Sequence, residues 1–231
     1  MPGDRARPHL RLMMAMSADG KIATVAREAA RFGSVEDERR LEEQVAWADA
    51  LLIAAGTLRA YGTTFRVLRP DLAKARKRRG QAPQPVSVVF TRSLDLPLTI
   101  PFFTRQQVPR LIVTTARNQA AAQERFDGLA EVLSWGADDV ELGQVVNALA
   151  DRGMKRLLGL GGGALNYALV AAGLVDELFL TVSPYLFGGA NAPTILDGPG
   201  FGPESAVTLR LVSSEVVGDE VFLHYRVLRR A

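Results

Sequence analysis

Short apolar runs separated by helix-like segments constrain the fold of this 231-residue chain more than any other feature. The runs cover residues 11–17, 50–56, 85–90, 110–115 and 154–160. Runs of this length with little polar alternation are typical of strands that are buried on both faces of a sheet. The sequence therefore predicts a central, mostly parallel β-sheet.

The segments between the runs carry helical signals. Residues 34–49 begin with Ser34 and Asp37 at the spacing of a capping box, with Asp in the position of Glu or Gln, and continue with apolar residues at helical spacing. Residues 139–153 place Leu and Val side chains on one face, and a third helix is expected over 164–174. Strands that alternate with helices indicate an α/β protein.

The last third of the chain has a different pattern, with longer strands expected over 175–189, 207–217 and 220–229. The last two are interpreted as a hairpin joined across Gly218 and Asp219. This pattern predicts a three-layer α/β fold whose carboxyl-terminal strands are antiparallel. The apolar hairpin would leave an exposed edge on a monomer, which favours a homodimer.

The composition argues against several classes of protein. The chain has no cysteine and only two histidines, His9 and His224, so no metal site is expected. Neither histidine has an acidic neighbour in the sequence, and both are expected to be structural. No apolar run is long enough to span a membrane and the amino terminus has no signal-peptide core, so we expect a cytoplasmic protein. We expect a single domain over 1–231, with residues 1–8 as a flexible extension.

A basic run dominates the charge pattern and includes Lys74, Arg76, Lys77, Arg78 and Arg79. These five charges exceed the formal net charge of +3, so the rest of the chain sums to −2. Nucleic-acid sites usually spread over a face and include aromatic or groove-reading elements. We therefore expect a solvated helix end here and no nucleic-acid partner, with a phosphate-backbone site as the alternative.

Three consecutive glycines, Gly161, Gly162 and Gly163, stand between the last apolar run and the helix expected over 164–174. A strand that ends in glycines before a helix presents free backbone N–H groups and a helix dipole to an anion. The spacing differs from the G-x-G-x-x-G fingerprint of dinucleotide-binding folds. From these residues alone, a phosphate site and a tight turn both remain open.

Several stretches resemble one family. In order, "MSADGKIA", "ADALLIAAGTL" and "GGGALNYALVAAGLVDELFLTVSPYLFGGANAPTILDGPGF" resemble the pyrimidine reductases of riboflavin biosynthesis. That family includes the carboxyl-terminal reductase domain of the bacterial deaminase-reductase and free-standing archaeal and fungal enzymes. The resemblance runs from about residue 9 to the carboxyl terminus. It implies a fold like that of dihydrofolate reductase and an NADPH-dependent reduction of a ribosylaminopyrimidine 5′-phosphate, which turns the ribosyl group into ribityl.

The resemblance also implies where NADPH binds. The three glycines lie along its diphosphate, and Thr57 after Gly56 contacts a phosphate from a second strand end. Arg92 and Ser93 follow a third strand and hold the adenosine end. Gly188 and Gly189 shape a loop near the nicotinamide. An arginine and a hydroxyl suit a 2′-phosphate, although the arginine could equally be an exposed loop residue. The implied cofactor residues are Gly56, Thr57, Arg92, Ser93, Gly161, Gly162, Gly163, Gly188 and Gly189.

On the substrate side the resemblance implies two catalytic residues, Asp19 and Lys21. An alternative is that the two side chains only stabilise the turn after the first strand. The implied substrate contacts are Ser17, Arg31 and Ser34. Three further candidate contacts could compensate for carboxylates that the family has and this chain lacks, namely Tyr61, Thr63 and Arg66.

Two departures from the family pattern fall on the substrate side. Tyr61, Gly62 and Thr63 stand where the family has Asp-Asp-Pro, and Leu160 stands where it has a glutamate before the glycines. Loss of carboxylates from a polyhydroxy site costs specificity unless other groups compensate. The chain could hold the same substrate differently or reduce another small substrate. A non-catalytic nucleotide- or nucleic-acid-binding protein is the third alternative.

Overall fold

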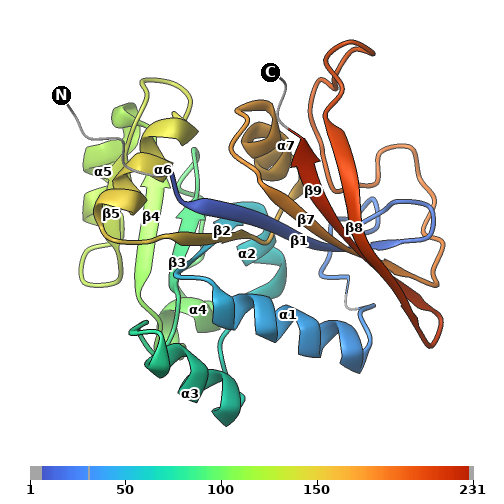
Figure 1. Cartoon of the computed structure of the whole chain (residues 1–231). Helices are drawn as coiled ribbons and strands as arrows, with labels where there is room; N and C mark the ends of the chain where they lie inside the picture. The colour runs from blue at the N-terminus through green and yellow to red at the C-terminus, as the bar shows by residue number, and fades with distance from the viewer. Residues whose placement is uncertain (1–6, 31, 229–231) are drawn as a thin grey trace.

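One mixed sheet forms the middle layer of the molecule (Figure 1). The computed structural model describes residues 7–30 and 32–228, and within them the sheet has nine strands in the order β5-β4-β3-β2-β6-β1-β7-β9-β8. Strands β1 to β7 are parallel to their neighbours among themselves, and β8 and β9 are antiparallel. The strands are β1 His9–Ser17, β2 Ala50–Ala54, β3 Val86–Phe90, β4 Arg110–Thr114, β5 Glu131–Ser134, β6 Arg156–Gly159, β7 Glu177–Ser183, β8 Thr208–Val217 and β9 Glu220–Leu228.

Helices cover both faces of the sheet and bury two apolar cores. One core contains side chains from α1 to α5, and the other contains side chains from α6 and α7. Figure 1 shows α1 and α3 on one side of the sheet and α7 on the other. The predicted three-layer α/β fold is therefore confirmed. The helices are α1 Val35–Trp47, α2 Ala55–Tyr61, α3 Pro70–Arg78, α4 Pro101–Thr104, α5 Gln119–Arg125, α6 Leu142–Asp151 and α7 Gly163–Ala171, with a short 3₁₀ turn at Ala116–Asn118.

Some element boundaries differ from the sequence-based expectation. The strand expected over 50–56 ends at Ala54, and Gly56 and Thr57 lie in the first turn of α2. The strand expected over 175–189 ends at Ser183, where the chain leaves the sheet as a loop. In both cases apolar composition continues past the last ladder hydrogen bond, so hydrophobicity alone does not mark the end.

The capping box predicted at the start of α1 forms in part. The Ser34 hydroxyl accepts a hydrogen bond from the Asp37 backbone N–H at 3.1 Å, as expected. The reciprocal arm does not form, because the Ser34 N–H donates to Glu220 Oε1 at 3.2 Å. The Asp37 side chain turns instead toward β7 and accepts from the Thr181 hydroxyl at 2.7 Å.

We expect Asp37→Asn to stabilise the protein, and more so at alkaline pH. Burial raises the pKa of the Asp37 carboxyl, and the nearby Glu220 charge adds to the rise. A raised folded-state pKa means that stability present below the unfolded pKa is lost as pH rises through the folded pKa. Asparagine keeps an acceptor for Thr181 without the charge. Thermal unfolding should show a higher Tm for the variant at about pH 8, with the difference shrinking toward about pH 4; a constant difference would contradict this account.

The basic run contains one arginine that the sequence analysis placed wrongly in solvent. Arg76 is only 1% exposed, and its guanidinium donates to the carbonyls of Ala46, Ala48 and Ala82. Burial lowers the pKa of Arg76 to about 10, so the side chain is still charged at neutral pH. Its charge lies at the carboxyl end of α1, where a helix dipole favours a cation. Arg79 also donates to the Ala46 carbonyl, so the run joins α3 to α1.

Arg76→Ala should destabilise the fold by about 3 kcal/mol, because it removes a buried side chain and leaves the buried Ala48 carbonyl without its Arg76 donor. The matched control is Arg78→Ala, since Arg78 is exposed on the same helix and should change stability by less than about 0.5 kcal/mol. Urea unfolding followed by tryptophan fluorescence measures both. Equal losses for the two variants would show that the buried contacts of Arg76 contribute little.

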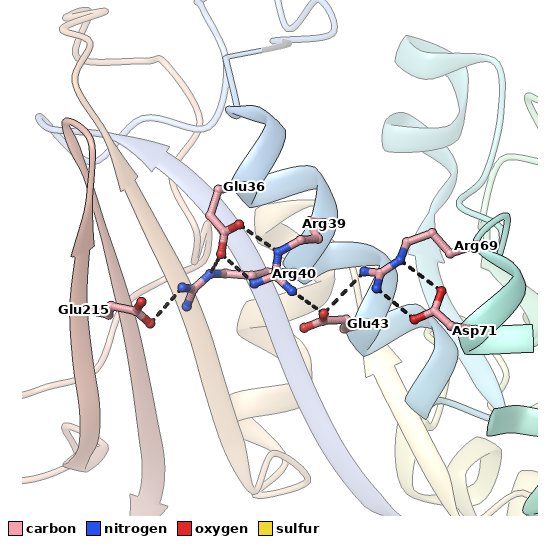
Figure 2. A network of polar contacts seen from close by, with 7 residues as sticks. All are labelled: Glu36, Arg39, Arg40, Glu43, Arg69, Asp71 and Glu215. Atoms are coloured by element: carbon pink, nitrogen blue, oxygen red, sulfur yellow. Dashed lines mark hydrogen bonds and ion pairs between the residues drawn. The ribbon is translucent and has the colours of Figure 1, made fainter.

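An ion-pair network ties α1 to its neighbours (Figure 2). Arg40 donates to Glu36 on its own helix at 2.6 Å and to Glu215 on β8 at 2.7 Å. Glu43 lies 3.4 Å from Arg69, the residue before α3. Exposed pairs contribute little singly. Their arrangement nevertheless links α1 to the carboxyl-terminal hairpin on one side and to α3 on the other.

The order of the strands fixes where a ligand can bind. The chain moves outward from β2 to β3, β4 and β5, and β6 then returns between β2 and β1. In open parallel sheets, ligands bind beyond the carboxyl ends of the strands at such a switch point. In the described part of the chain, no helix is long and apolar enough to cross a membrane.

Candidate active site

The three glycines follow β6 at this switch point, between the carboxyl ends of β2 and β1. The Gly161 carbonyl accepts from the Ala54 N–H at 2.8 Å, which joins the turn to the end of β2. Gly161 has a φ of +89°, a conformation that glycine adopts without strain. A Cβ added to Gly162 would lie 3.3 Å from Thr57 Oγ1. The structure thus brings Thr57 beside the glycine turn, as the resemblance implied.

Gly163 has a different role from its two neighbours. A Cβ at this position would lie 2.4 Å from the Thr194 carbonyl oxygen and 2.8 Å from the Asp197 carboxylate. Gly163 is therefore required for the close approach of a loop, whereas Gly161 and Gly162 shape the turn. Gly163 also begins α7, whose first N–H groups have no intrahelical acceptor and whose dipole favours an anion. The structure thus shows a tight turn and a close approach of two segments in the glycine run, and phosphate binding there stays a prediction.

The segment 192–197 connects the glycine turn to the turn after β1. The Asp197 N–H donates to the Gly163 carbonyl at 3.0 Å, and the Asp197 carboxylate accepts from the Thr194 N–H at 2.9 Å. Thr194 in turn forms an antiparallel bridge with Lys21. The sequence analysis did not single out Asp197, although the residue lies in the "APTILDGPGF" stretch that carried the resemblance.

Asp19 is held as a fixed anion at the end of β1. Its carboxylate accepts from the Ser17 hydroxyl at 2.5 Å, from the Gly188 N–H at 2.6 Å and from the Phe187 N–H at 3.2 Å. These bonds, the Ser17 hydroxyl most of all, lower the pKa of Asp19 to about 2. Asp19 is therefore ionised throughout the neutral range and has no proton to give. Gly188 lies at this site through its backbone, and Gly189 follows it with Val25 packed against its Cα.

Lys21 lies beside Asp19 but is not paired with it. Its backbone N–H donates to the Ser17 hydroxyl at 2.9 Å, and its ammonium lies 3.4 Å from the Ala192 carbonyl oxygen. Among the residues that the structure describes, no carboxylate forms an ion pair with Lys21. The alternative of a turn-stabilising Asp19–Lys21 ion pair does not occur in this structure. The ammonium is available to an anionic or hydroxylated ligand.

Aromatic side chains bring a second segment to the loop that holds Asp19. The Phe32 ring lies 5.3 Å from the ring of Phe187 and 6.0 Å from that of Tyr185. The Tyr61 hydroxyl donates to the Ala30 carbonyl at 3.1 Å. The end of α2 and the segment before α1 thus both reach the substrate side of the site.

Other implied substrate residues do not join this group. Thr63 and Arg66 are exposed on the chain after α2. Thr64 lies between them in the sequence, and its N–H donates to the Gln106 side chain. Gln106 precedes β4, so it lies near the amino ends of the parallel strands and not near the carboxyl ends, where Asp19 lies. The structure does not bring Arg66 into contact with Asp19. The roles of Thr63 and Arg66 as substrate contacts stay predictions.

Three further expectations concern Arg31 and Ser34, which precede α1 in the sequence, and Leu160, which follows β6. Arg31 lies outside the described residues. The Ser34 hydroxyl is already engaged, since it caps α1 and donates to Glu220. Leu160 is buried in the core on the α1 face, so the position of the family glutamate is filled here by apolar packing.

The residues expected at the adenosine end follow β3. Arg92 is 70% exposed and pairs with Asp139 at 2.5 Å, which leaves both interpretations of this arginine open. Ser93 lines an open hollow of about 680 Å³ together with Leu94 and Arg125. From β3 through β2 and β6 to β1 is three strand spacings, roughly 14 Å. The implied cofactor residues thus form a row that ends beside Asp19.

The histidines differ from the sequence-based description in one respect. His9 Nε2 lies 3.3 Å and His224 Nε2 lies 3.6 Å from the Glu177 carboxylate, so both histidines have an acidic neighbour in space although neither has one in the sequence. The neighbour comes from β7 and is distant in sequence. Burial lowers the pKa of His224. His9 begins β1, so it lies at the edge opposite the glycine turn, which fits a structural role. Within the described residues, no group of three potential ligands gathers for a metal ion.

Two buried carboxylates that the sequence did not reveal lie near the substrate side, Asp37 and Glu220. Glu220 follows the β8–β9 turn and is the first residue of β9. The alternation of apolar and polar residues along the strand does not decide on which face of the hairpin this first side chain lies. A signal was present for Asp37 only as part of the capping box. Both side chains are engaged by hydroxyl groups.

Together, these features define an α/β protein with a candidate ligand site at the carboxyl ends of its parallel strands, where a glycine turn adjoins an aspartate and a lysine. The chain belongs to the RibD C-terminal domain family, whose model matches residues 8–223. The resemblance inferred from the sequence is therefore confirmed.

Two relatives extend over most of the chain, and each is named 2,5-diamino-6-ribosylamino-4(3H)-pyrimidinone 5′-phosphate reductase. The protein from Methanothermobacter thermautotrophicus is 32% identical over 227 residues, which are 96% of this chain and 99% of the relative. The one from Archaeoglobus fulgidus is 31% identical over 195 residues, or 84% of this chain and 89% of the relative.

Solved structures confirm the fold. A pyrimidine reductase-like protein from Corynebacterium diphtheriae is similar with a TM-score of 0.84 at 22% identity, over 96% of this chain and 93% of that one. Dihydrofolate reductase from Enterococcus faecalis has a TM-score of 0.53 at 15% identity, over 95% and 96% of the two chains. The expected likeness to dihydrofolate reductase is therefore correct.

Proposed function

We propose that this protein is an NADPH-dependent reductase that converts the ribosyl group of a ribosylaminopyrimidine 5′-phosphate into ribityl, a step of riboflavin biosynthesis. The observation that supports the proposal most is that the glycine turn and the turn after β1 lie next to each other. Segment 192–197 joins the glycine turn at Gly163 to the turn that bears Asp19 and Lys21. The names of the two archaeal relatives supply the substrate class.

The glycine turn and its neighbours fit a dinucleotide diphosphate. Among the residues that the structure describes, and apart from the two neighbours of Gly162 in the chain, only the Thr57 hydroxyl lies within 4 Å of a Cβ built on Gly162, so a ligand can approach this part of the backbone closely. The first N–H groups of α7 and the Thr57 hydroxyl would donate to phosphate oxygens. Arg92 would exchange Asp139 for a 2′-phosphate, which favours NADPH over NADH. When bound, NADPH supplies hydride from its nicotinamide.

Two residues after β1 and one at the end of α2 act on different parts of the substrate. Asp19 stays ionised and accepts hydrogen bonds from hydroxyl groups of the substrate, which orients the sugar toward the nicotinamide. Lys21 provides the positive charge for a phosphate or hydroxyl group and is the protein's own candidate for a proton donor, with solvent as the other source. Tyr61 replaces a family carboxylate as a hydrogen-bonding group on the far side of the site.

Oxidation of NADPH measured separately with the diaminated and the deaminated ribosylaminopyrimidine 5′-phosphate tests this function. We expect turnover of at least one, and the ratio of the two kcat/KM values identifies the natural substrate. Tight NADPH binding without turnover of either would contradict the substrate class and favour another small substrate, as the changes at Tyr61 and Leu160 allow. No binding of NADPH would contradict the reductase itself.

We propose that the protein acts as a cytoplasmic homodimer that pairs through β8. This edge strand is exposed along its whole length, with Leu211 52% and Val216 70% exposed. Soluble proteins rarely leave such an apolar edge open, and two identical chains close most simply with two-fold symmetry. Light scattering should give about twice the chain mass of 25.0 kDa, whereas a monomer mass at micromolar concentration would contradict the dimer.

A further inference from the structure

Glu220 connects two parts of the substrate side that are far apart in sequence. It is the first residue of β9 and only 4% exposed. Its Oε1 accepts from the Ser183 hydroxyl at 2.9 Å and from the Ser34 N–H at 3.2 Å, and its Oε2 accepts from the Ser34 hydroxyl. One buried carboxylate thus holds the start of α1 and the end of β7 together.

Glu220 replaces a partner that α1 could have supplied itself. In a capping box, the third residue of the helix accepts from the N–H of the cap residue. Here Asp37 is the third residue of the helix, but its carboxylate accepts a hydrogen bond from the Thr181 hydroxyl. The carboxylate of Glu220 accepts the hydrogen bond from the Ser34 N–H in place of Asp37. The start of α1 is therefore fixed by the hairpin and not by local contacts alone. Its position depends on β9.

Both ends that Glu220 holds lead directly into the site. Ser34 follows Phe32, whose ring packs against Phe187. Ser183 precedes the loop in which the N–H groups of Phe187 and Gly188 bind the Asp19 carboxylate. A shift of either end would therefore move the donors that orient Asp19.

Burying a carboxylate carries a large unfavourable free energy. Removing a charge from water is unfavourable unless hydrogen bonds compensate for the lost hydration. Glu220 has three donors for this purpose, and none of them is a cation. An apolar residue could fill the space, but it would leave Ser34 and Ser183 free to choose other geometries.

We propose that Glu220 is a positioning residue that sets the separation between the start of α1 and the end of β7, and thereby the geometry of the loop that holds Asp19. It makes no contact with Asp19 or Lys21 in the structure. The proposal deepens the proposed function, on which its kinetic predictions rest.

The variants Glu220→Ala and Glu220→Gln test this role. We expect Glu220→Ala to lower kcat/KM for the pyrimidine phosphate by about tenfold or more, while the Kd for NADPH changes less than about twofold. Glutamine keeps one acceptor oxygen and should restore part of the loss. If the alanine variant does not fold, Ser183→Ala, which removes a single donor, should show the same pattern with a smaller amplitude.

The matched control is Glu215→Gln, since Glu215 ties the same hairpin to α1 through Arg40 but has a side chain that is 59% exposed in the single chain (Figure 2). This variant should leave kcat/KM unchanged. Equal effects of the Glu215 and Glu220 variants, or a parallel loss of NADPH affinity, would overturn the proposal in favour of a general loss of stability.

Amide hydrogen exchange separates this proposal from the proposed function. In Glu220→Ala, exchange should become faster at residues 34–38 and 184–188, and Glu215→Gln should leave both segments unchanged. This readout needs no substrate. If the wild-type protein turns over neither pyrimidine phosphate, the proposed function fails, while unchanged exchange at both segments would overturn the role of Glu220 on its own.

Discussion

Asp19→Asn is expected to lower kcat/KM for the ribosylaminopyrimidine phosphate by about 100-fold, with NADPH affinity nearly unchanged. The carboxylate accepts from the backbone N–H groups of both Phe187 and Gly188. An amide has only one acceptor oxygen, so its NH₂ group would face one of these donors. The loop would then shift, and the negative charge that orients the sugar would be lost.

Steady-state kinetics with the substrate varied at saturating NADPH measures this effect. Asp71→Asn is a suitable control, because Asp71 is an exposed aspartate at the start of α3 that pairs with Arg69. The pH profile adds a second check. Since the pKa of Asp19 is lowered to about 2, wild-type activity should not fall with protonation of this group between about pH 5 and pH 8. Wild-type activity in the asparagine variant would remove Asp19 from the mechanism.

Gly163→Ala is expected to damage cofactor binding and stability together. The new Cβ would lie 2.4 Å from the Thr194 carbonyl oxygen, which is backbone and can move only with its loop. Overpacking of this kind costs about 1–3 kcal/mol. Because segment 192–197 also contacts Lys21, displacement of the loop should weaken NADPH binding and lower turnover, each by about tenfold or more.

Gly143→Ala is the matched control for this substitution. Gly143 also lies in the first turn of a helix, α6, but beyond its chain neighbours and the backbone of that helix turn no heavy atom of the described residues lies within 4 Å of an added Cβ. Alanine should therefore raise stability there by about 0.5 kcal/mol and leave NADPH binding unchanged. Urea unfolding and fluorescence titration with NADPH measure both quantities. A Gly163→Ala protein with normal stability and affinity would contradict the close approach of Thr194.

The layers of the fold could be predicted from the sequence because the buried strands are apolar and the helices are periodic. The four-residue strand β5 and the helix α5 before it gave no comparable signal, since a short strand shows little alternation. Arg76 illustrates a second limit. Within its run it looks like any other surface cation, and only the geometry of α3 against α1 turns its guanidinium toward the carbonyls of Ala46 and Ala48.

In the candidate site, too, some residues could be predicted from the sequence and others could not. Thr57, Asp19 and the glycine turn could be placed together because each follows a parallel strand, and such ends share one edge. Asp197 and Glu220 act through contacts with residues far away in sequence. Their hydrogen bonds depend on loop paths and on the register of β9, which no local pattern encodes.

The most direct test of the proposed reduction is the fate of hydride from NADPH labelled with deuterium at both hydrogen positions of C4 of the nicotinamide. The account places the glycine turn, Asp19 and Lys21 around one transfer from NADPH to the sugar. Mass spectrometry of the product should therefore show one deuterium at C1′ of a ribityl chain. Unlabelled product, or recovery of the ribosyl compound with NADPH unoxidised, would contradict the assignment of this edge of the sheet as a reductase site.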